Sequence, residues 1–189
     1  MRAEDLDSIF VARAHHRPIT VASTDAVAGS RIGGRAPDVL AGAPVRCRRC
    51  GGAMAYDLTL AAADLGAAEE VSHFHCQDFQ CLLKSRALDT LRDPPSTFAV
   101  AHATSRRAPA ATGHDSAVEP RALTVGPPRD AQLPSQDSKI GGHPGFVQGE
   151  GPEATLAAAG LGFLFQFSEA DYPKGMAVPT YPFAFGILY

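Results

Sequence analysis

The chain reads "SRIGGRAPDVL" at residues 30–40 and repeats much of this phrase as "SKIGGHPGFVQ" at residues 138–148. Each copy places a serine, a basic residue and an isoleucine before a pair of glycines, which are Gly33 and Gly34 in the first copy and Gly141 and Gly142 in the second. A glycine pair permits backbone conformations with positive φ, and a nearby proline stiffens the chain that leaves the turn. The doubled phrase therefore predicts the same tight turn at two places in the chain.

A second match supports a duplication. The stretch "YDLTLAAADL" (56–65) aligns with "FLFQFSEADY" (163–172) at an offset of 107, close to the offset of 108 between the glycine turns. In this alignment Leu58 matches Phe165, and Asp64 matches Asp171. Two matches in the same order and at nearly the same offset indicate two related halves. Each half would contain a glycine turn, a loop, and a hydrophobic strand that leads into an acidic corner.

The composition is that of a globular protein. The chain has 189 residues, of which 45% are apolar and 20% charged, so we expect a buried core in one ordinary domain or two small ones. A net charge of −3 gives no general reason to expect nucleic acid or an anionic membrane as a partner. The acidic N-terminus does not resemble a secretory signal, and no apolar run approaches the roughly 18 residues of a membrane span. We expect a cytoplasmic protein.

Local patterns predict a β-rich α+β fold, with mainly antiparallel sheet and a zinc-knuckle-like insertion in the first half. In the strand predicted after the first cysteine pair, apolar Met54, Tyr56, Leu58 and Leu60 alternate with other residues, which is typical of a half-buried strand. The other predicted elements are helices at 3–14, 81–92 and 153–160 and strands at 17–23 and 162–167.

A proline-rich segment separates the two predicted halves. Residues 101–136 contain five prolines and show no sustained periodicity, which predicts a linker or mobile insertion. The predicted organisation is therefore a first repeat over 1–100, this linker, and a second repeat over 137–189.

The four cysteines all lie in the predicted first half. Their order is Cys47-x2-Cys50, then 25 residues, then Cys76-x4-Cys81. In a reducing cytoplasm such a set favours metal binding or free thiols over disulfides. Four thiolates would hold zinc as a closed tetrahedron that stabilises the fold by on the order of 10 kcal/mol and leaves no position for water.

Two histidines leave the ligand set open. Either His73 or His75 could replace a cysteine and give a Cys3His site, because both lie close before Cys76. A site with an open position could activate water as a metal-dependent hydrolase does, although no general base is evident nearby.

Basic residues flank both cysteine pairs. They are Arg46, Arg48, Arg49, Lys84 and Arg86. A nucleic-acid-binding zinc ribbon has such a pattern. Cations beside a tetrathiolate site also offset its negative charge, and the absence of interleaved aromatic residues favours this second interpretation.

No complete catalytic motif is present. The chain lacks a phosphate-binding P-loop and the G-x-S-x-G nucleophile motif. Asp64 and Asp171 could form a carboxylate pair, but we expect them at separate, equivalent corners. His15 and His16 are expected at a helix end, and His143 at the surface. Whether the protein is an enzyme stays open, with a non-enzymatic role favoured.

Taken together, the S-[KR]-I-G-G-x-P turn, the "FLFQF" strand leading to "YP", and the terminal "PFAFGILY" resemble the DUF1963 (YwqG-like) family. The stretches "CRRCGGAMAYDLTL" and "HFHCQDFQC" are also similar to the cysteine-bearing repeat of the programmed cell death protein 2 type. The resemblance covers residues 30–81 and 138–189. It implies a β-rich fold built from a repeated unit, zinc in the cysteine-bearing members, and roles in protein interaction that include immunity against toxins.

The sequence departs from these families in two respects. The second cysteine pair is C-x4-C, and the chain ends at residues 187–189, where relatives continue. The resemblance therefore suggests a truncated second repeat with an unpaired sheet edge. The overall expectation is a zinc-stabilised protein-interaction module with an immunity or regulatory role.

Overall fold

The computed structural model describes residues 15–42, 45–78, 81, 97–130, 136–145, 163–176 and 187–188. The helices expected at 3–14 and 153–160 lie outside these residues. The helix expected at 81–92 lies outside them too, except for its first residue, Cys81.

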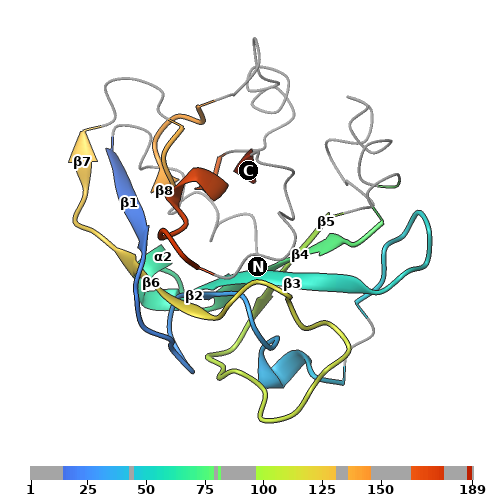
Figure 1. Cartoon of the computed structure of the whole chain (residues 1–189). Coiled ribbons are helices and arrows are strands. Elements are labelled where there is room, and N and C mark those ends of the chain that lie inside the picture. Colours follow the sequence, from blue (N-terminus) through green and yellow to red (C-terminus); the bar gives the residue numbers. More distant parts are fainter. Residues whose placement is uncertain are drawn as a thin grey trace.

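One curled antiparallel sheet organises the described chain (Figure 1). Its path runs β10-β9-β8-β1-β6-β2-β3-β4-β5, and β7 pairs with β1 beside this path. The predicted β-rich, mainly antiparallel fold is confirmed. The strands are β1 (His15–Val21), β2 (Arg31–Ile32), β3 (Met54–Leu60), β4 (Glu70–Cys76), β5 (Thr97–His102), β6 (Arg121–Val125), β7 (Arg129–Asp130), β8 (Lys139–Gly141), β9 (Phe165–Ser168) and β10 (Ile187–Leu188).

Helical structure is sparse among the described residues. The short helix α2 (Ala62–Leu65) follows β3 and ends at Gly66 in the left-handed conformation. Two 3-10 turns, η2 (Asp38–Leu40) and η4 (Glu169–Asp171), follow the first glycine turn and β9. No helix among the described residues is long and apolar enough to cross a membrane.

A β-bulge in β3 changes which face of the sheet its side chains join. The pairing of β3 with β4 shifts register between Tyr56 and Leu58, so Asp57 is the extra residue. Before the bulge, Met54 and Tyr56 pack into one core, and after it Leu58 and Leu60 pack into another. Every residue of β3 is buried. The prediction of a half-buried strand is therefore wrong. The bulge divides a single apolar series between two faces of the sheet, and both faces are covered.

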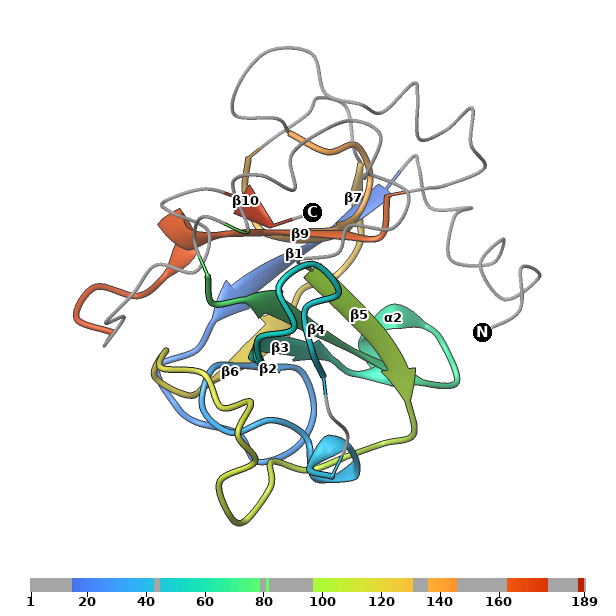
Figure 2. The same cartoon turned by 90° about the vertical axis from the view of Figure 1, so that its right-hand side faces the viewer.

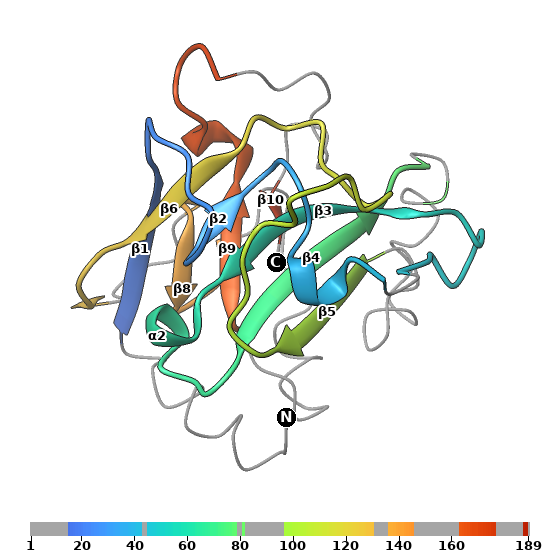
Figure 3. The same ribbon diagram turned by 90° about the horizontal axis from the view of Figure 1, so that it is seen from below.

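The two cores lie on opposite faces of the β3–β4–β5 region. One core joins both predicted halves and contains Ile19, Ile32, Leu58, Leu60, Leu65, Val71, Leu123, Ile140, Phe165 and Phe167. The other contains Ala36, Val45, Met54, Tyr56, Phe74 and three cysteines. Figure 3 shows β3, β4 and β5 side by side, with the loop between β5 and β6 crossing them.

The segment expected as a linker is an integral part of the fold up to Asp130; residues 131–135 lie outside the described chain. β6 lies between β1 and β2 in the sheet. The loop before β6 buries Ala108, His114 and Val118. Its backbone is also paired, as in the 2.7 Å hydrogen bond from the Tyr56 amide to the His114 carbonyl. Prolines interrupt local periodicity, but hydrogen bonds to distant segments fix this backbone.

The two glycine turns make corresponding backbone contacts. The Gly33 amide donates to the Asp57 carbonyl at 2.8 Å, and the Gly141 amide donates to the Leu164 carbonyl at 2.9 Å. All four glycines of the two pairs have positive φ, between 68° and 75°. Ile32 pairs with Leu58 as Ile140 pairs with Phe165. Residues that match in the sequence alignment therefore occupy equivalent positions in the two pairs of strands.

The serines before the turns also bind alike. The Ser30 hydroxyl accepts a hydrogen bond from the Ala61 amide at 2.8 Å, and the Ser138 hydroxyl accepts one from the Ser168 amide at 2.9 Å. Ser30 donates through its hydroxyl to Asp64 at 2.6 Å, and Ser138 donates through its amide to Asp171 at 2.7 Å. Each aspartate thus binds the serine of its own turn. The two aspartates position the turns and do not form a shared acid–base site.

A third pair of matching segments meets at the centre of the sheet. β1 contains "RPITV" (17–21) and β6 contains "RALTV" (121–125), a similarity too short to stand out in the sequence alone. The two strands are antiparallel with Thr20 opposite Thr124. Around this pair the contacts are reciprocal: the Ile19 amide donates to the Ser138 carbonyl and the Leu123 amide to the Ser30 carbonyl, both at 2.8 Å. β1 thereby pairs with β8, and β6 with β2.

Candidate metal centre

Four cysteines meet where β3 begins and β4 ends. Cys47 and Cys50 lie in the turn before β3, and Cys76 is the last residue of β4. Met54 lies opposite Cys76 in the ladder, so antiparallel pairing returns the chain to the first cysteine pair. Cys81 follows shortly after.

The geometry of the sulfur atoms suits a tetrahedral metal ion. The four Sγ atoms all lie within 4.8 Å of one another. Cys47 Sγ is 3.6 Å from Cys81 Sγ, and Cys50 Sγ is 3.5 Å from Cys76 Sγ. A regular tetrahedron with metal–sulfur bonds of about 2.3 Å has sulfur–sulfur distances of about 3.8 Å. Disulfides need about 2.0 Å, and all four cysteines are free thiols.

The turn that holds the first pair is built by its backbone. The Cys47 amide donates to the Gly52 carbonyl at 2.9 Å, and the Gly51 amide donates to the Cys47 carbonyl at 2.8 Å. Gly51 has a φ of 73°, which favours glycine. A Cβ at position 52 would lie 3.3 Å from the Cys50 sulfur. Both glycines of "RCRRCGG" are thus explained by the tight path around the sulfur atoms.

The thiols differ in acidity. Burial acts to raise the pKa of Cys47, but hydrogen bonds from the backbone amides of Cys50 and Arg49 and from neighbouring thiols hold it at about 7. Burial and the nearby Cys47 thiol raise the pKa of Cys81 to about 11. Burial likewise raises the pKa of Cys76 well above its usual range. Because adjacent thiolates repel one another, a divalent cation is the natural partner for the whole set.

The surroundings of the thiols favour a closed site. Cys47, Cys76 and Cys81 are buried, and Cys50 is exposed. The three buried cysteines belong to the second core, beside Met54 and Phe74. A metal held here would tie the turn before β3 to the end of β4.

Exposed arginines surround the turn. Arg46, Arg48 and Arg49 are all exposed, and Arg46 donates to the Gly51 carbonyl at 3.1 Å. Lys84 and Arg86, the other two predicted nucleic-acid contacts, lie outside the described residues.

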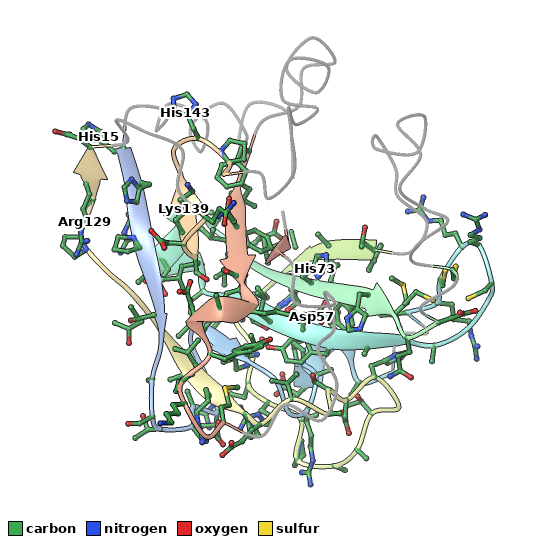
Figure 4. The ribbon with its side chains drawn as sticks, turned by 45° about the horizontal axis from the view of Figure 1, so that its top comes forward. His15, Asp57, His73, Arg129, Lys139 and His143 are labelled. Atoms are coloured by element: carbon green, nitrogen blue, oxygen red, sulfur yellow. The ribbon has the colours of Figure 1, made fainter. Side chains whose placement is uncertain are left out.

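The two candidate histidine ligands bind a carboxylate. His73 Nδ1 lies 2.7 Å from Asp57 Oδ2, and His75 Nδ1 lies 2.5 Å from Asp57 Oδ1. The group of potential ligands found among the described residues contains the four cysteines without either histidine. Figure 4 shows Asp57 and His73 in the interior, far from His15 and His143.

Electrostatics holds this buried cluster together. Burial acts to raise the pKa of Asp57, but the adjacent His75 and hydrogen bonds from both histidines keep it below its usual value. Burial acts to lower the pKa of His75, yet Asp57 and then Glu169 raise it. The bulge explains the cluster, because an extra residue in β3 turns a carboxylate toward two alternate residues of β4. In the sequence this cluster is marked only by the spacing H-x-H, which also suits metal ligands, because the contact with Asp57 depends on the bulge.

A second buried polar network was not predicted from the sequence. The Ser72 hydroxyl lies 2.7 Å from His102 Nε2, and Glu70 Oε2 lies 4.0 Å from His102 Nδ1. These residue types also occur in hydrolase triads. Ser72, however, is fully buried and also bonds to Thr59 at 2.8 Å, so no substrate reaches it. The network satisfies buried polar groups between strands.

The remaining histidines take other places than expected. His15 and His16 are the first residues of β1, not a helix end, and His15 Nδ1 lies 3.1 Å from Asp130. His143, expected at the surface, is half-buried after the second glycine turn.

Comparisons of the chain with protein-family models, curated proteins and solved structures gave no match. The resemblance to DUF1963 proteins and to the programmed cell death protein 2 repeat therefore stays a prediction.

Proposed function

We propose that the protein is a non-enzymatic protein-interaction module stabilised by one structural zinc ion on Cys47, Cys50, Cys76 and Cys81. The observation that carries the metal site is the mutual distance of the four Sγ atoms, all within 4.8 Å. Zinc suits this donor set because four thiolates in a tetrahedron are its common structural coordination. A complete set of protein ligands leaves no open position, which favours stabilisation over catalysis.

We also infer that the chain arose by duplication. In support, the serines and glycines of both turns bind equivalent partners, and β1 and β6 meet reciprocally at Thr20 and Thr124. In the duplicated arrangement, each copy begins with a strand that pairs with the glycine-turn strand of the other copy. These pairs are β1 with β8 and β6 with β2. All four cysteines lie in the first half, so the metal site would be an addition to one copy.

The non-enzymatic role is supported by the arrangement of the polar clusters, whereas the interaction role is what the sequence resemblance implies. The histidines near the cysteines are engaged with a buried carboxylate, and the buried serine near His102 is closed to substrate. These features favour a structural use of residues that would otherwise suggest catalysis. A role in immunity or regulation is what the sequence resemblance implies, and the cytoplasmic location is the expectation from the acidic N-terminus and the absence of a long apolar run in the sequence.

Thermal unfolding with and without metal tests the structural role. We expect the zinc-loaded protein to melt at a clearly higher temperature than protein treated with chelator, and zinc to restore the original transition. Circular dichroism before heating checks that both samples are folded. Equal melting temperatures for two folded samples would contradict a structural metal.

A nucleic-acid-binding zinc ribbon is the second candidate. The exposed Arg46, Arg48 and Arg49 around the metal turn favour it locally. It requires salt-dependent binding of RNA or DNA that weakens in the R48E/R49E variant. If the variant binds nucleic acid as well as the wild-type protein does, the binding site lies elsewhere on the surface and the zinc-ribbon function is contradicted.

A further inference from the structure

β5 forms one end of the strand order. It spans Thr97–His102 and, within the described part of the chain, pairs with β4 alone. No backbone hydrogen bond reaches its outer edge from the described residues. A strand in this position offers a row of amide and carbonyl groups to another strand. Figure 2 shows β5 at the front of the sheet.

This edge lacks the features that usually protect sheet edges. The sequence "TFAVAH" contains no proline, lysine or carboxylate, and its pairing with β4 is regular over all six residues. Natural edge strands discourage further pairing with charges, prolines or bulges. Ala99 at the middle is exposed, while Phe98 and Val100 pack on the second core. The edge is thus an uncharged and regular template for another strand.

Positive charge lies beyond one end of this edge. Thr97, which begins β5, pairs with His75, the residue before the metal-site Cys76. The arginine-bearing turn therefore lies at the Thr97 end of the strand, and Arg48 and Arg49 are exposed there. A strand added antiparallel to β5 would run from His102 toward Thr97. Its C-terminal end would then approach the arginines.

We propose that the outer edge of β5 binds an extended peptide segment of a partner protein as an added antiparallel strand, with acidic residues directly after that strand. The proposal rests on the interaction role and names its partner chemistry. Backbone hydrogen bonds along the edge supply affinity, as in other cases of strand addition. The arginines beyond Thr97 set the direction of the peptide and make binding depend on salt.

The test uses zinc-loaded full-length protein and a fluorescent peptide of alternating threonine and valine that ends in several glutamates. Fluorescence anisotropy measures its Kd. Two further peptides carry backbone N-methyl groups at alternate residues, one for each of the two alternating sets. Because alternate residues of a paired strand face the edge, we expect one methylated peptide to bind about tenfold more weakly and the other nearly as well as the parent.

Two protein variants locate the site. Ala99→Asp puts a charge at the centre of the edge, and we expect it to weaken binding about tenfold or more. Val27→Asp is the matched control, because Val27 is a 62% exposed apolar residue outside the strands, and its Kd should be unchanged. In the R48E/R49E variant binding should weaken several-fold, and a peptide with glutamates at its N-terminal end should also bind less well.

Several outcomes would overturn the proposal. They are equal effects of the two methylated peptides, equal effects of Ala99→Asp and Val27→Asp, tighter binding of the reversed peptide, or no binding. If the protein associates with itself and Ala99→Asp abolishes this association, the edge of β5 binds a second copy of the chain and not the peptide. Binding of RNA that excludes the peptide would assign the arginine end to nucleic acid. Zinc content measured on the same sample separates a failed docking site from a failed metal site.

Discussion

The first glycine turn and the second make corresponding hydrogen bonds, but the strands that receive them differ in chemistry. At the first turn, Gly33 bonds to β3, which carries the bulged Asp57. The four cysteines lie in the turn before β3, at the end of β4 and shortly after it. At the second turn, Leu164 accepts the equivalent backbone bond and Phe165 and Phe167 fill the core. The backbone contacts are common to both turns, whereas the bulged aspartate and the four clustered cysteines lie beside the first. Fold and site can therefore be perturbed separately.

The largest effect should come from the metal ligands. Cys76→Ser removes a buried ligand, and we expect it to lose zinc and on the order of 5 kcal/mol of unfolding free energy. Denaturant unfolding together with zinc analysis measures both. A chelator should then destabilise the wild-type protein but leave the variant unchanged. A variant that keeps zinc and full stability would contradict the proposed ligand set.

The next largest loss of stability should come from the buried carboxylate of Asp57 in β3. Asp57→Asn keeps the shape but removes the charge that binds two histidines, and we expect a loss of about 3 kcal/mol in urea unfolding. Because the folded pKa of Asp57 is lowered, its charge contributes stability above the unfolded pKa that is lost as the pH falls through the folded value. The variant should lack this part of the acid dependence. Identical pH profiles for both proteins would assign acid sensitivity to other groups.

The first glycine turn should be sensitive to a single methyl group. A Cβ at Gly33, whose φ is 68°, would lie 2.6 Å from the Val118 carbonyl oxygen. We expect Gly33→Ala to cost about 2–3 kcal/mol by thermal or chemical unfolding. Gly51→Ala is the control, since Gly51 also has positive φ but nothing within 4 Å of a new Cβ, and it should cost about 1 kcal/mol. Equal costs would show that steric approach adds nothing at Gly33.

The smallest effect compares the two serines. Ser30→Ala removes the hydroxyl acceptor of the half-buried Ala61 amide and a donor to Asp64, and Ser138→Ala removes the acceptor of the buried Ser168 amide, so both should cost about 1–2 kcal/mol. Urea unfolding of the two variants measures the pair directly. A large cost at one serine and none at the other would mean that the corresponding contacts are not equally used.

The sequence predicted the two glycine turns better than the segments that have no match elsewhere in the chain. The paired matches predicted a glycine turn and a hydrophobic strand in each copy, and the structure adds that Ile32 pairs with Leu58 and Ile140 with Phe165. It also identified the four cysteines that meet. The bulge at Asp57 was not predictable from the sequence. An extra strand residue leaves the apolar alternation intact, but it moves the side chains after the bulge to the other face of the sheet. β6 was missed because "RALTV" is short and lies between prolines.

Long-range contacts account for the other differences. His73 and His75 were expected near the metal, but the residue that binds them comes from the neighbouring strand and depends on the bulge. The loop before β6 looked unstructured because its partners, such as Tyr56, are distant in sequence. Spacing along the chain identifies ligands on one turn, whereas contacts between strands require the register.

Zinc stoichiometry on untagged protein, combined with thiol titration before and after chelation, distinguishes a closed metal centre from four free thiols. We expect one zinc ion per chain and four thiols that react only after the metal is removed. Absence of metal, together with four thiols that react freely in the folded protein, would contradict a closed metal centre and leave the cysteine cluster as ordinary packing.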